Sequence, residues 1–110
     1  MSLLEEPRYQ QLADTAFRRI EDGFQDVDPE EVDCERAGDV VTLLFRSGTR
    51  CIVNTQRPTR QIWLAANARA WHFSYDESGD RWMDDKGTGA ELFATLSRIV
   101  KDTVGVDVAF

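Results

Sequence analysis

The sequence predicts an α+β fold, a two-layer sandwich in which an N-terminal and a C-terminal helix pack on one face of an antiparallel sheet of five to six strands. Three observations predict it. A helical pattern of apolar residues lies near each end of the 110-residue chain. Between them, short alternating segments follow one another at about ten-residue spacing, which is typical of an antiparallel meander. No repeat or linker interrupts this pattern, so we expect residues 1–110 to form a single domain.

The first helix is expected over residues 9–24, because apolar residues recur there three and four positions apart. The apolar stripe consists of Tyr9, Leu12, Ala13, Ala16, Phe17, Ile20 and Phe24. Asp14, Glu21 and Asp22 project to the opposite side of the helix, where we expect water. Pro29 and the residues before it end the helix, since proline disfavours helical geometry in the residue that precedes it.

Strands are expected next. Residues 31–35 alternate strictly, which places Val32 and Cys34 inward. Later strands are expected at 40–46, 49–54, 61–66, 70–75 and 81–84. Ser47-Gly48 is a plausible tight turn between two of them, because glycine adopts a positive φ without strain.

The second helix is expected over residues 90–104, with Thr88 or Gly89 near its start. The sequence Lys86-Gly87-Thr88-Gly89 lacks the order of a phosphate-binding P-loop, so a turn is the better interpretation. Two helices separated in sequence by a sheet bury their apolar faces by packing side by side on it. The other sheet face is then left to solvent.

The composition limits the class of protein. A content of 42% hydrophobic and 30% charged residues is typical of a soluble globular protein. No apolar run approaches the ~20 residues of a membrane-spanning helix, and the first ten residues resemble neither a secretory signal nor a transit peptide, so we expect a cytoplasmic protein without membrane contact. Cys34 and Cys51 are expected as buried small hydrophobes. The single histidine, His72, is expected on the sheet surface without a catalytic role.

The net charge of −7 is confined to the first third of the chain. Residues 1–39 hold twelve acidic residues and four arginines, whereas residues 40–110 hold eight acidic and nine basic residues. A phosphate backbone attracts basic surfaces, so this distribution argues against nucleic-acid binding. A concentrated negative field attracts cations or a basic protein surface, and it also keeps a protein soluble.

We expect the carboxylates of the first helix, the following loop and the first strand to form one acidic ridge. The acidic ridge consists of Asp14, Glu21, Asp22, Asp26, Asp28, Glu30, Glu31, Asp33 and Glu35. Carboxylate oxygens are hard ligands that suit magnesium, calcium, manganese and iron. The residues after Asp26 do not follow the EF-hand pattern, so weak and unselective binding of divalent cations is expected. From the residues alone, cations and a basic protein surface both remain open as ligands of the ridge.

A stretch at residues 54–65 reads N-x-Q-x-P-x-x-Q-I-W-L-A, with Asp33-Cys34-Glu35 upstream and Trp71-His72-Phe73 downstream. Together these residues resemble the bacterial frataxin (CyaY) family over essentially the whole chain. The resemblance implies a protein that binds ferrous and ferric iron through its acidic ridge. It also implies a non-enzymatic, regulatory role in iron–sulfur cluster assembly, through contact with the cysteine desulfurase and the scaffold protein.

The resemblance transfers to this chain residue by residue. The ridge positions that carry over are Glu21, Asp22, Asp26, Asp28, Glu30, Asp33 and Glu35. Gln25 departs from the family, where relatives often have an acid, and Pro29 stands in a loop that looks about one residue short. A basic presequence, found in mitochondrial relatives, is missing, which favours a cytoplasmic, bacterial-type member.

Trp63 is a candidate for partner contact. Strand alternation places Ile62 and Leu64 on one face and Trp63 on the other, so Trp63 lies on the open sheet surface if the aliphatic pair faces the helices. An exposed tryptophan near Asn54 and Gln56 has the composition of a binding hot spot. Glu21 and Asp22 are expected to share the partner contact. The alternative is a tryptophan that merely packs among surface neighbours.

Two other functions compete with the regulatory one. The first is an iron-oxidising, storing or donating chaperone, although the paired E-x-x-H motifs of a di-iron bundle are missing from the sequence. The second is a metal-independent acidic module that binds a basic partner. We expect a monomer that can oligomerise with iron.

Overall fold

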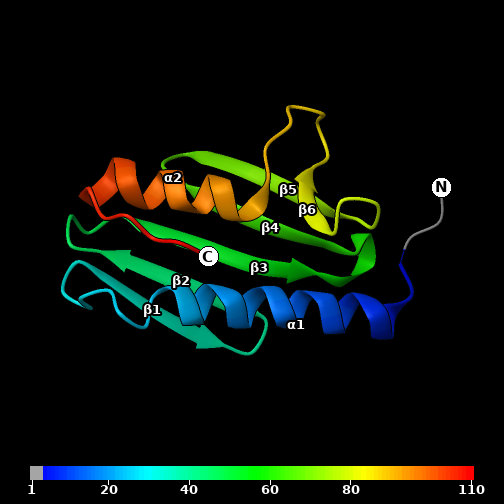
Figure 1. Cartoon of the computed structure of the whole chain (residues 1–110), viewed down its shortest axis with the longest axis horizontal. Helices are drawn as coiled ribbons and strands as arrows, with labels where there is room; N and C mark the ends of the chain where they lie inside the picture. Colours follow the sequence, from blue (N-terminus) through cyan, green and yellow to red (C-terminus); the bar gives the residue numbers. More distant parts are fainter. Residues whose placement is uncertain (1–3) are drawn as a thin grey trace.

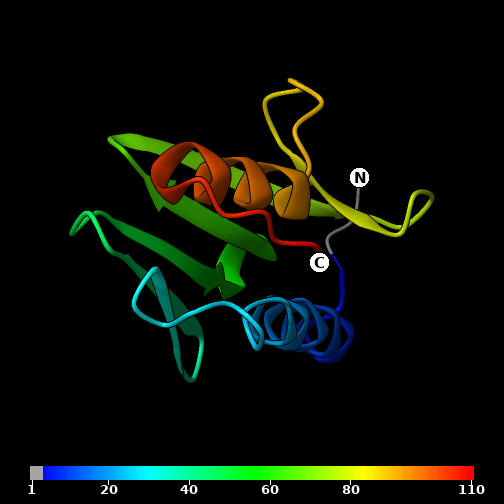
Figure 2. The ribbon, with the colours of Figure 1, turned by 60° about the vertical axis from the view of Figure 1, so that its left-hand side comes forward.

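The computed structural model describes residues 4–110, so the first three residues of the predicted domain lie outside the described residues. Two helices lie side by side on one face of a six-stranded antiparallel sheet, and both views show them on the same side of it (Figures 1 and 2). The elements in chain order are α1 Glu6–Gly23, β1 Val32–Ala37, β2 Val40–Phe45, β3 Arg50–Gln56, the 3-10 turn η1 Arg57–Thr59, β4 Gln61–Ala66, β5 Arg69–Asp76, β6 Arg81–Asp84 and α2 Leu92–Val104. The predicted fold class is confirmed.

The sheet is a meander with the strand order β1-β2-β3-β4-β5-β6. Each strand pairs with the next because the connections are short, which brings sequence neighbours together before distant segments can compete. The predicted turn at Ser47-Gly48 is present, and Gly48 has a φ of 89°. The turn between β4 and β5 also needs left-handed backbone, which Asn67 and Ala68 supply at φ values of 53° and 61°.

The core lies between the sheet and the helices. The buried apolar residues of the strands alternate with half-buried or exposed ones, as the sequence pattern predicts. From the helices, the core receives Tyr9, Ala13, Ala16, Phe17, Ile20, Leu92, Phe93, Leu96, Ile99 and Val100. Cys51 is fully buried, as expected, whereas Cys34 is only half-buried. Burial raises the pKa of the Cys51 thiol to about 12, so it stays protonated and inert.

The opposite sheet face, called here the outer face, carries no helix. Val40, Leu44 and Ile52 are the large apolar side chains exposed there, with 36%, 41% and 40% of their surface accessible. Trp63 and His72 are half-buried on the same face. The predicted placement of both residues on this face is confirmed.

The start of α2 differs from the prediction. Its N-cap is Glu91, whose carboxylate accepts hydrogen bonds from the backbone N–H groups of Phe93 and Ala94. Thr88 instead donates its hydroxyl to Asp84 at 2.7 Å. A glutamate at this position was overlooked because the usual capping residues are Ser, Thr, Asp and Asn, and Glu91 serves because its side chain folds back over the first turn.

The segment after α2 runs back between the two helices (Figure 2). Val108 is buried, and the Phe110 ring contacts Phe24 and Phe93, each at a centroid distance of 5.7 Å. Arg19 donates to the Phe110 carbonyl oxygen at 2.9 Å. The C-terminal segment therefore ties α1 to α2, which the sequence pattern did not indicate. No helix within residues 4–110 is long and apolar enough to cross a membrane.

Candidate functional site

The acidic ridge follows the end of α1, the loop at residues 24–31 and the edge strand β1. Phe24 and Val32 are buried at the two ends of the loop and hold it against the core. Within the loop, the Asp28 carboxylate accepts the backbone N–H of Glu30 at 2.9 Å. Because the loop ends are anchored, its acidic side chains project into solvent, where Asp26, Asp28 and Glu30 are exposed.

β1 distributes the ridge over both sides of the sheet edge. Asp33 pairs in register with Leu44 and Glu35 with Thr42, so both acids lie toward the outer face. Arg36 is the next residue and therefore points to the side on which α1 lies. The ridge wraps around the edge strand instead of forming a single stripe.

Arg36 binds two of the nine ridge carboxylates. Its Nη2 lies 2.6 Å from Asp14 Oδ1, and its Nη1 lies 3.3 Å from Glu21 Oε1. The hydrogen bond from Arg36 lowers the pKa of the Asp14 carboxyl, and the same contact raises the pKa of Arg36. Asp14 and Glu21 were predicted on the watery side of α1; both are half-buried against β1, because the basic side chain that faces them comes from another element.

A third ridge acid is also paired, whereas the others carry free charge. Glu31 lies 2.9 Å from Arg46. Across residues 4–110, no basic side chain forms an ion pair with the remaining six, which are Asp22, Asp26, Asp28, Glu30, Asp33 and Glu35. The described part of the chain also contains no group of three or more metal-ligating side chains arranged to hold an ion. The ridge carboxylates are therefore spread over an exposed surface, where a bound cation would keep most of its water ligands.

A hollow of about 320 Å³ lies within the ridge, between the end of α1 and β1. Glu21, Gln25, Asp33 and Cys34 line it, with apolar side chains beneath. Burial, together with the negative charges of Glu21 and Asp33, raises the pKa of the Cys34 thiol to about 11. A protonated thiol is a poor metal ligand, so the hollow offers oxygen ligands only.

The second candidate region is the row of side chains around Trp63 on the outer face. Asn54 lies opposite Trp63 on β3, and Gln56 lies opposite Gln61 one pair further along. The three predicted partner-binding residues Trp63, Asn54 and Gln56 are therefore neighbours on one face, and all are half-buried. Together they form a flat and accessible surface.

Trp63 is held by residues that sequence reasoning missed. Its indole stacks on the His72 imidazole at 4.1 Å with an interplanar angle of 14°. Its Nε1 donates to Gln61 Oε1 at 2.9 Å. Gln61 in turn donates to Ser74 at 3.1 Å and to Asp85 at 2.9 Å. Strand alternation placed His72 on this face, but only the cross-strand register shows that it lies beside Trp63.

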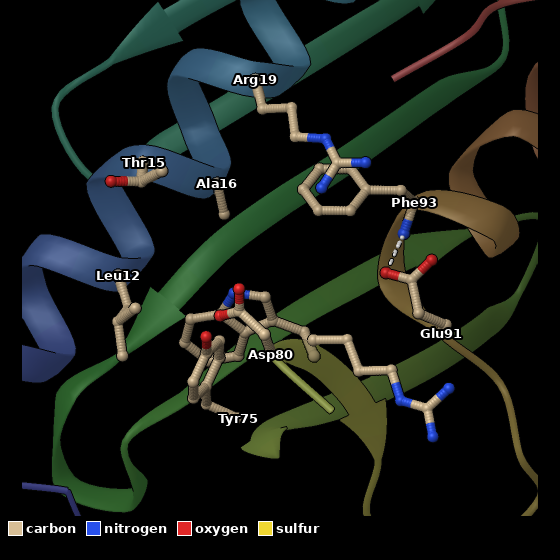
Figure 3. Close-up of a pocket in the computed structure, with 10 residues that line it drawn as sticks. Leu12, Thr15, Ala16, Arg19, Tyr75, Asp80, Glu91 and Phe93 are labelled. Carbon is tan, nitrogen blue, oxygen red and sulfur yellow. Dashed lines mark hydrogen bonds between the residues drawn. The ribbon is translucent and has the colours of Figure 1, made fainter. Parts of the chain in front are cut away.

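A groove of about 540 Å³ lies between α1, α2 and β6 (Figure 3). Two of its polar groups are already engaged: the Arg19 guanidinium lies 4.0 Å from the centre of the Phe93 ring, and Glu91 caps α2 through the bond drawn in Figure 3. Tyr75 and Trp82 fill its floor and contact one another at 5.2 Å.

The fold and these surfaces define a small two-layer protein whose charged ridge and flat sheet face suit cation and partner binding. Residues 2–106 match the family model of the frataxin-like domain, so the chain belongs to the frataxin-like family.

Its similarity to known members extends over nearly the full length. The chain is 41% identical over 107 residues to the iron-sulfur cluster assembly protein CyaY of Pseudomonas fluorescens strain Pf0-1, covering 97% of this chain and 96% of the relative. It is 37% identical to the protein of that name from Azotobacter vinelandii, with the same coverage.

Two solved structures show the same fold. Frataxin from Psychromonas ingrahamii superposes with a TM-score of 0.86 at 30% identity and covers 96% of both chains. Trimeric frataxin from Saccharomyces cerevisiae, crystallised in complex with ferrous iron, has a TM-score of 0.69 at 22% identity, covering 96% of this chain and 91% of that one.

Proposed function

We propose that this protein binds iron weakly through its acidic ridge and acts, as a single domain over residues 1–110, in iron–sulfur cluster assembly. The observation that carries the proposal is a set of six ridge carboxylates that have no basic partner among residues 4–110 and lie around one sheet edge. Family membership and the names of the bacterial relatives support the same role. These relatives also support a cytoplasmic site of action.

Weak iron binding is the chemical behaviour that this geometry favours. Carboxylates are hard oxygen ligands, and ferrous or ferric iron accepts them together with water. Without a cage, each ion contacts few protein ligands, so exchange is fast and magnesium or calcium competes. The acidic ridge then concentrates iron near the surface without storing it.

Partner contact would use both regions. The free charges of the acidic ridge attract a basic surface and speed association, whereas Trp63 provides apolar area for a long-lived contact. We propose the cysteine desulfurase and the iron–sulfur scaffold protein as partners, with Glu21, Asp22, Asn54, Gln56 and Trp63 in the contact. In this role the protein is a non-enzymatic regulator that works as a monomer.

A second candidate function is a metal-independent acidic module. The observation that favours it is that no three metal-ligating side chains within residues 4–110 are arranged around one point. In that case the acidic ridge would bind the basic partner directly. Iron would be no part of the contact.

The deciding experiment measures desulfurase binding with ferrous iron and with a chelator, under exclusion of oxygen. The test variant replaces four unpaired ridge acids by their amides: Asp22→Asn, Asp26→Asn, Asp28→Asn and Glu30→Gln. A matched control removes the same amount of charge at exposed positions away from the ridge: Glu5→Gln, Glu6→Gln, Asp80→Asn and Asp102→Asn.

We expect the ridge variant to lose iron-induced NMR shifts at the ridge amides and to bind the desulfurase more weakly, while the control resembles the wild type. Binding that is equally strong in chelator supports the metal-independent module. Unchanged iron shifts in the ridge variant would overturn the assignment of the ridge. Oxygen consumption after addition of ferrous iron, above a protein-free blank, would show an iron-oxidising enzyme instead.

A further inference from the structure

Four side chains form an incomplete ring of contacts on the outer face. Trp63 stacks on His72, Trp63 donates to Gln61, and Gln61 donates to Asp85 Oδ2. The same Asp85 oxygen lies 3.8 Å from His72 Nδ1, so this last contact of the ring is longer than a hydrogen bond. The residues come from β4, β5 and the segment after β6, so three separate parts of the chain fix the position of one indole.

The contact between His72 and Asp85 is the one contact of the ring that is not formed, and its formation depends on whether His72 is protonated. A separation of 3.8 Å between His72 Nδ1 and Asp85 Oδ2 is too long for a hydrogen bond. Imidazole is the side chain that takes up and releases a proton near neutral pH. When His72 gains its proton, the imidazolium and the Asp85 carboxylate attract one another and close the link with a charge-assisted hydrogen bond.

The side chains around His72 do not oppose the attraction between its protonated ring and Asp85. Asp85 is the charged group that faces it, from the segment after β6. Trp63 faces it from β4 and is uncharged, and its indole face attracts a cation. On β5 itself, the same face carries the uncharged Ala70 and Ser74 on either side of His72.

We propose that His72 is the positioning residue for Trp63 and that its protonation strengthens partner binding through the outer face. This inference rests on the proposed contact of Trp63 with the assembly machinery. In the protonated state the ring is closed and Trp63 is held in one orientation, so a partner loses less freedom when it binds. Partner affinity should therefore be higher when His72 is protonated than when it is neutral.

The free protein provides the first test. His72 is the only histidine in the chain, so its NMR titration is read without ambiguity. We expect the indole N–H signal of Trp63 to shift with the same midpoint as the His72 ring signal. Asp85→Asn removes the negative charge and should abolish the shift of the indole signal. An indole signal of Trp63 that is independent of the His72 titration would overturn the proposal.

Partner binding provides the second test, with His72→Phe as the matched variant. Phenylalanine keeps a flat ring beneath Trp63 but carries no proton, whereas His72→Ala removes the stack. From about pH 8 to about pH 6 we expect wild-type affinity for the desulfurase–scaffold complex to rise about threefold relative to His72→Phe. His72→Ala should bind about fivefold more weakly than His72→Phe at both values, because it lacks the stack. Equal pH dependence in the wild type and His72→Phe would overturn the proposal.

Trp63→Ala separates this inference from the proposed function. If Trp63→Ala binds the complex as tightly as the wild type, the proposed partner contact is wrong, whatever the NMR titration shows. If Trp63→Ala binds weakly while His72→Phe keeps the pH dependence of the wild type, the contact stands and the role of His72 is wrong. Circular dichroism of each variant confirms that the fold is retained in both comparisons.

Discussion

Arg36→Met tests the balance between stability and charge in the acidic ridge. Methionine keeps an apolar stem in the place of the Arg36 side chain, whose guanidinium lies 5.3 Å from the centre of the Phe17 ring, and removes the charge that holds Asp14 and Glu21. The Arg36 side chain is only 22% exposed, whereas its two acids are 39% and 43% exposed. The two ion pairs are therefore intermediate in burial between fully exposed and fully buried ion pairs.

The expected loss of stability follows from these exposures. Exposed pairs contribute about 0.2–1 kcal/mol, and hydrogen bonds to charged groups contribute about 1.5–3 kcal/mol. Two half-exposed contacts then give a decrease of about 1–2 kcal/mol in the free energy of unfolding at pH 7. Arg18→Met is the matched control, since Arg18 also pairs with Asp14 but is 74% exposed. This control should cost less than about 0.5 kcal/mol.

The effect must depend on pH with a definite sign. Because Arg36 lowers the pKa of Asp14 below its ordinary value of 3.8, the ionised pair stabilises the folded state above that value. The contribution is lost as the pH falls through the lowered pKa of the folded state. The difference between Arg36→Met and the wild type should thus be largest near pH 7 and shrink below about pH 3.

Urea unfolding of both proteins at several pH values measures this difference. Added magnesium should raise the stability of Arg36→Met more than that of the wild type, because Asp14 and Glu21 are then free to bind the ion. A variant as stable as the wild type at pH 7 would refute the reasoning. So would a difference that is the same at pH 7 and pH 3.

Three further predictions concern the ridge, the outer face and the C-terminal segment. The four-amide ridge variant should have a higher melting temperature than the wild type in low salt, because the removed charges repel one another. It should also lose the stabilisation by divalent ions. A melting temperature below that of the wild type in plain buffer would mean that the carboxylates stabilise the fold. Trp63→Ala should weaken partner binding by about 2 kcal/mol, mainly through faster dissociation in surface plasmon resonance, whereas a change confined to association would contradict its role as a hot spot. Gly23→Ala should destabilise the fold by about 1–3 kcal/mol in thermal unfolding, since a Cβ there would lie 2.5 Å from the Phe110 ring. Adding Phe110→Ala to the same protein should remove most of that penalty, because the clashing ring is then absent.

The helices and strands could be predicted because their signals are local. Strand alternation and helical spacing repeat within a few residues, and short connections left the meander as the simplest order of strands. The position of Trp63 on the outer face followed from its two aliphatic neighbours in the same strand. These predictions needed no information about distant contacts.

Apart from the Glu91 cap, the unpredicted features depend on contacts between distant segments. Arg36 lies 22 residues from Asp14 in the chain, and no local pattern links them. His72 was given no role because its stacking on Trp63 depends on the register of two strands. Phe110 follows the last helix without any periodic pattern, yet it contacts both helices. These contacts join side chains from different helices and strands, so no local sequence pattern predicts them.

β1 is an edge strand, and its outward acids govern how two copies of the chain meet. An exposed edge offers unpaired backbone groups to a neighbouring strand, and charged side chains are a common barrier to such pairing. Asp33 and Glu35 place two negative charges on this edge, so two approaching copies repel each other. A cation bound between these acids lowers that barrier, which makes the ion content of the solution a control on self-association. The residues proposed to bind iron therefore also keep the strand edges of separate molecules apart.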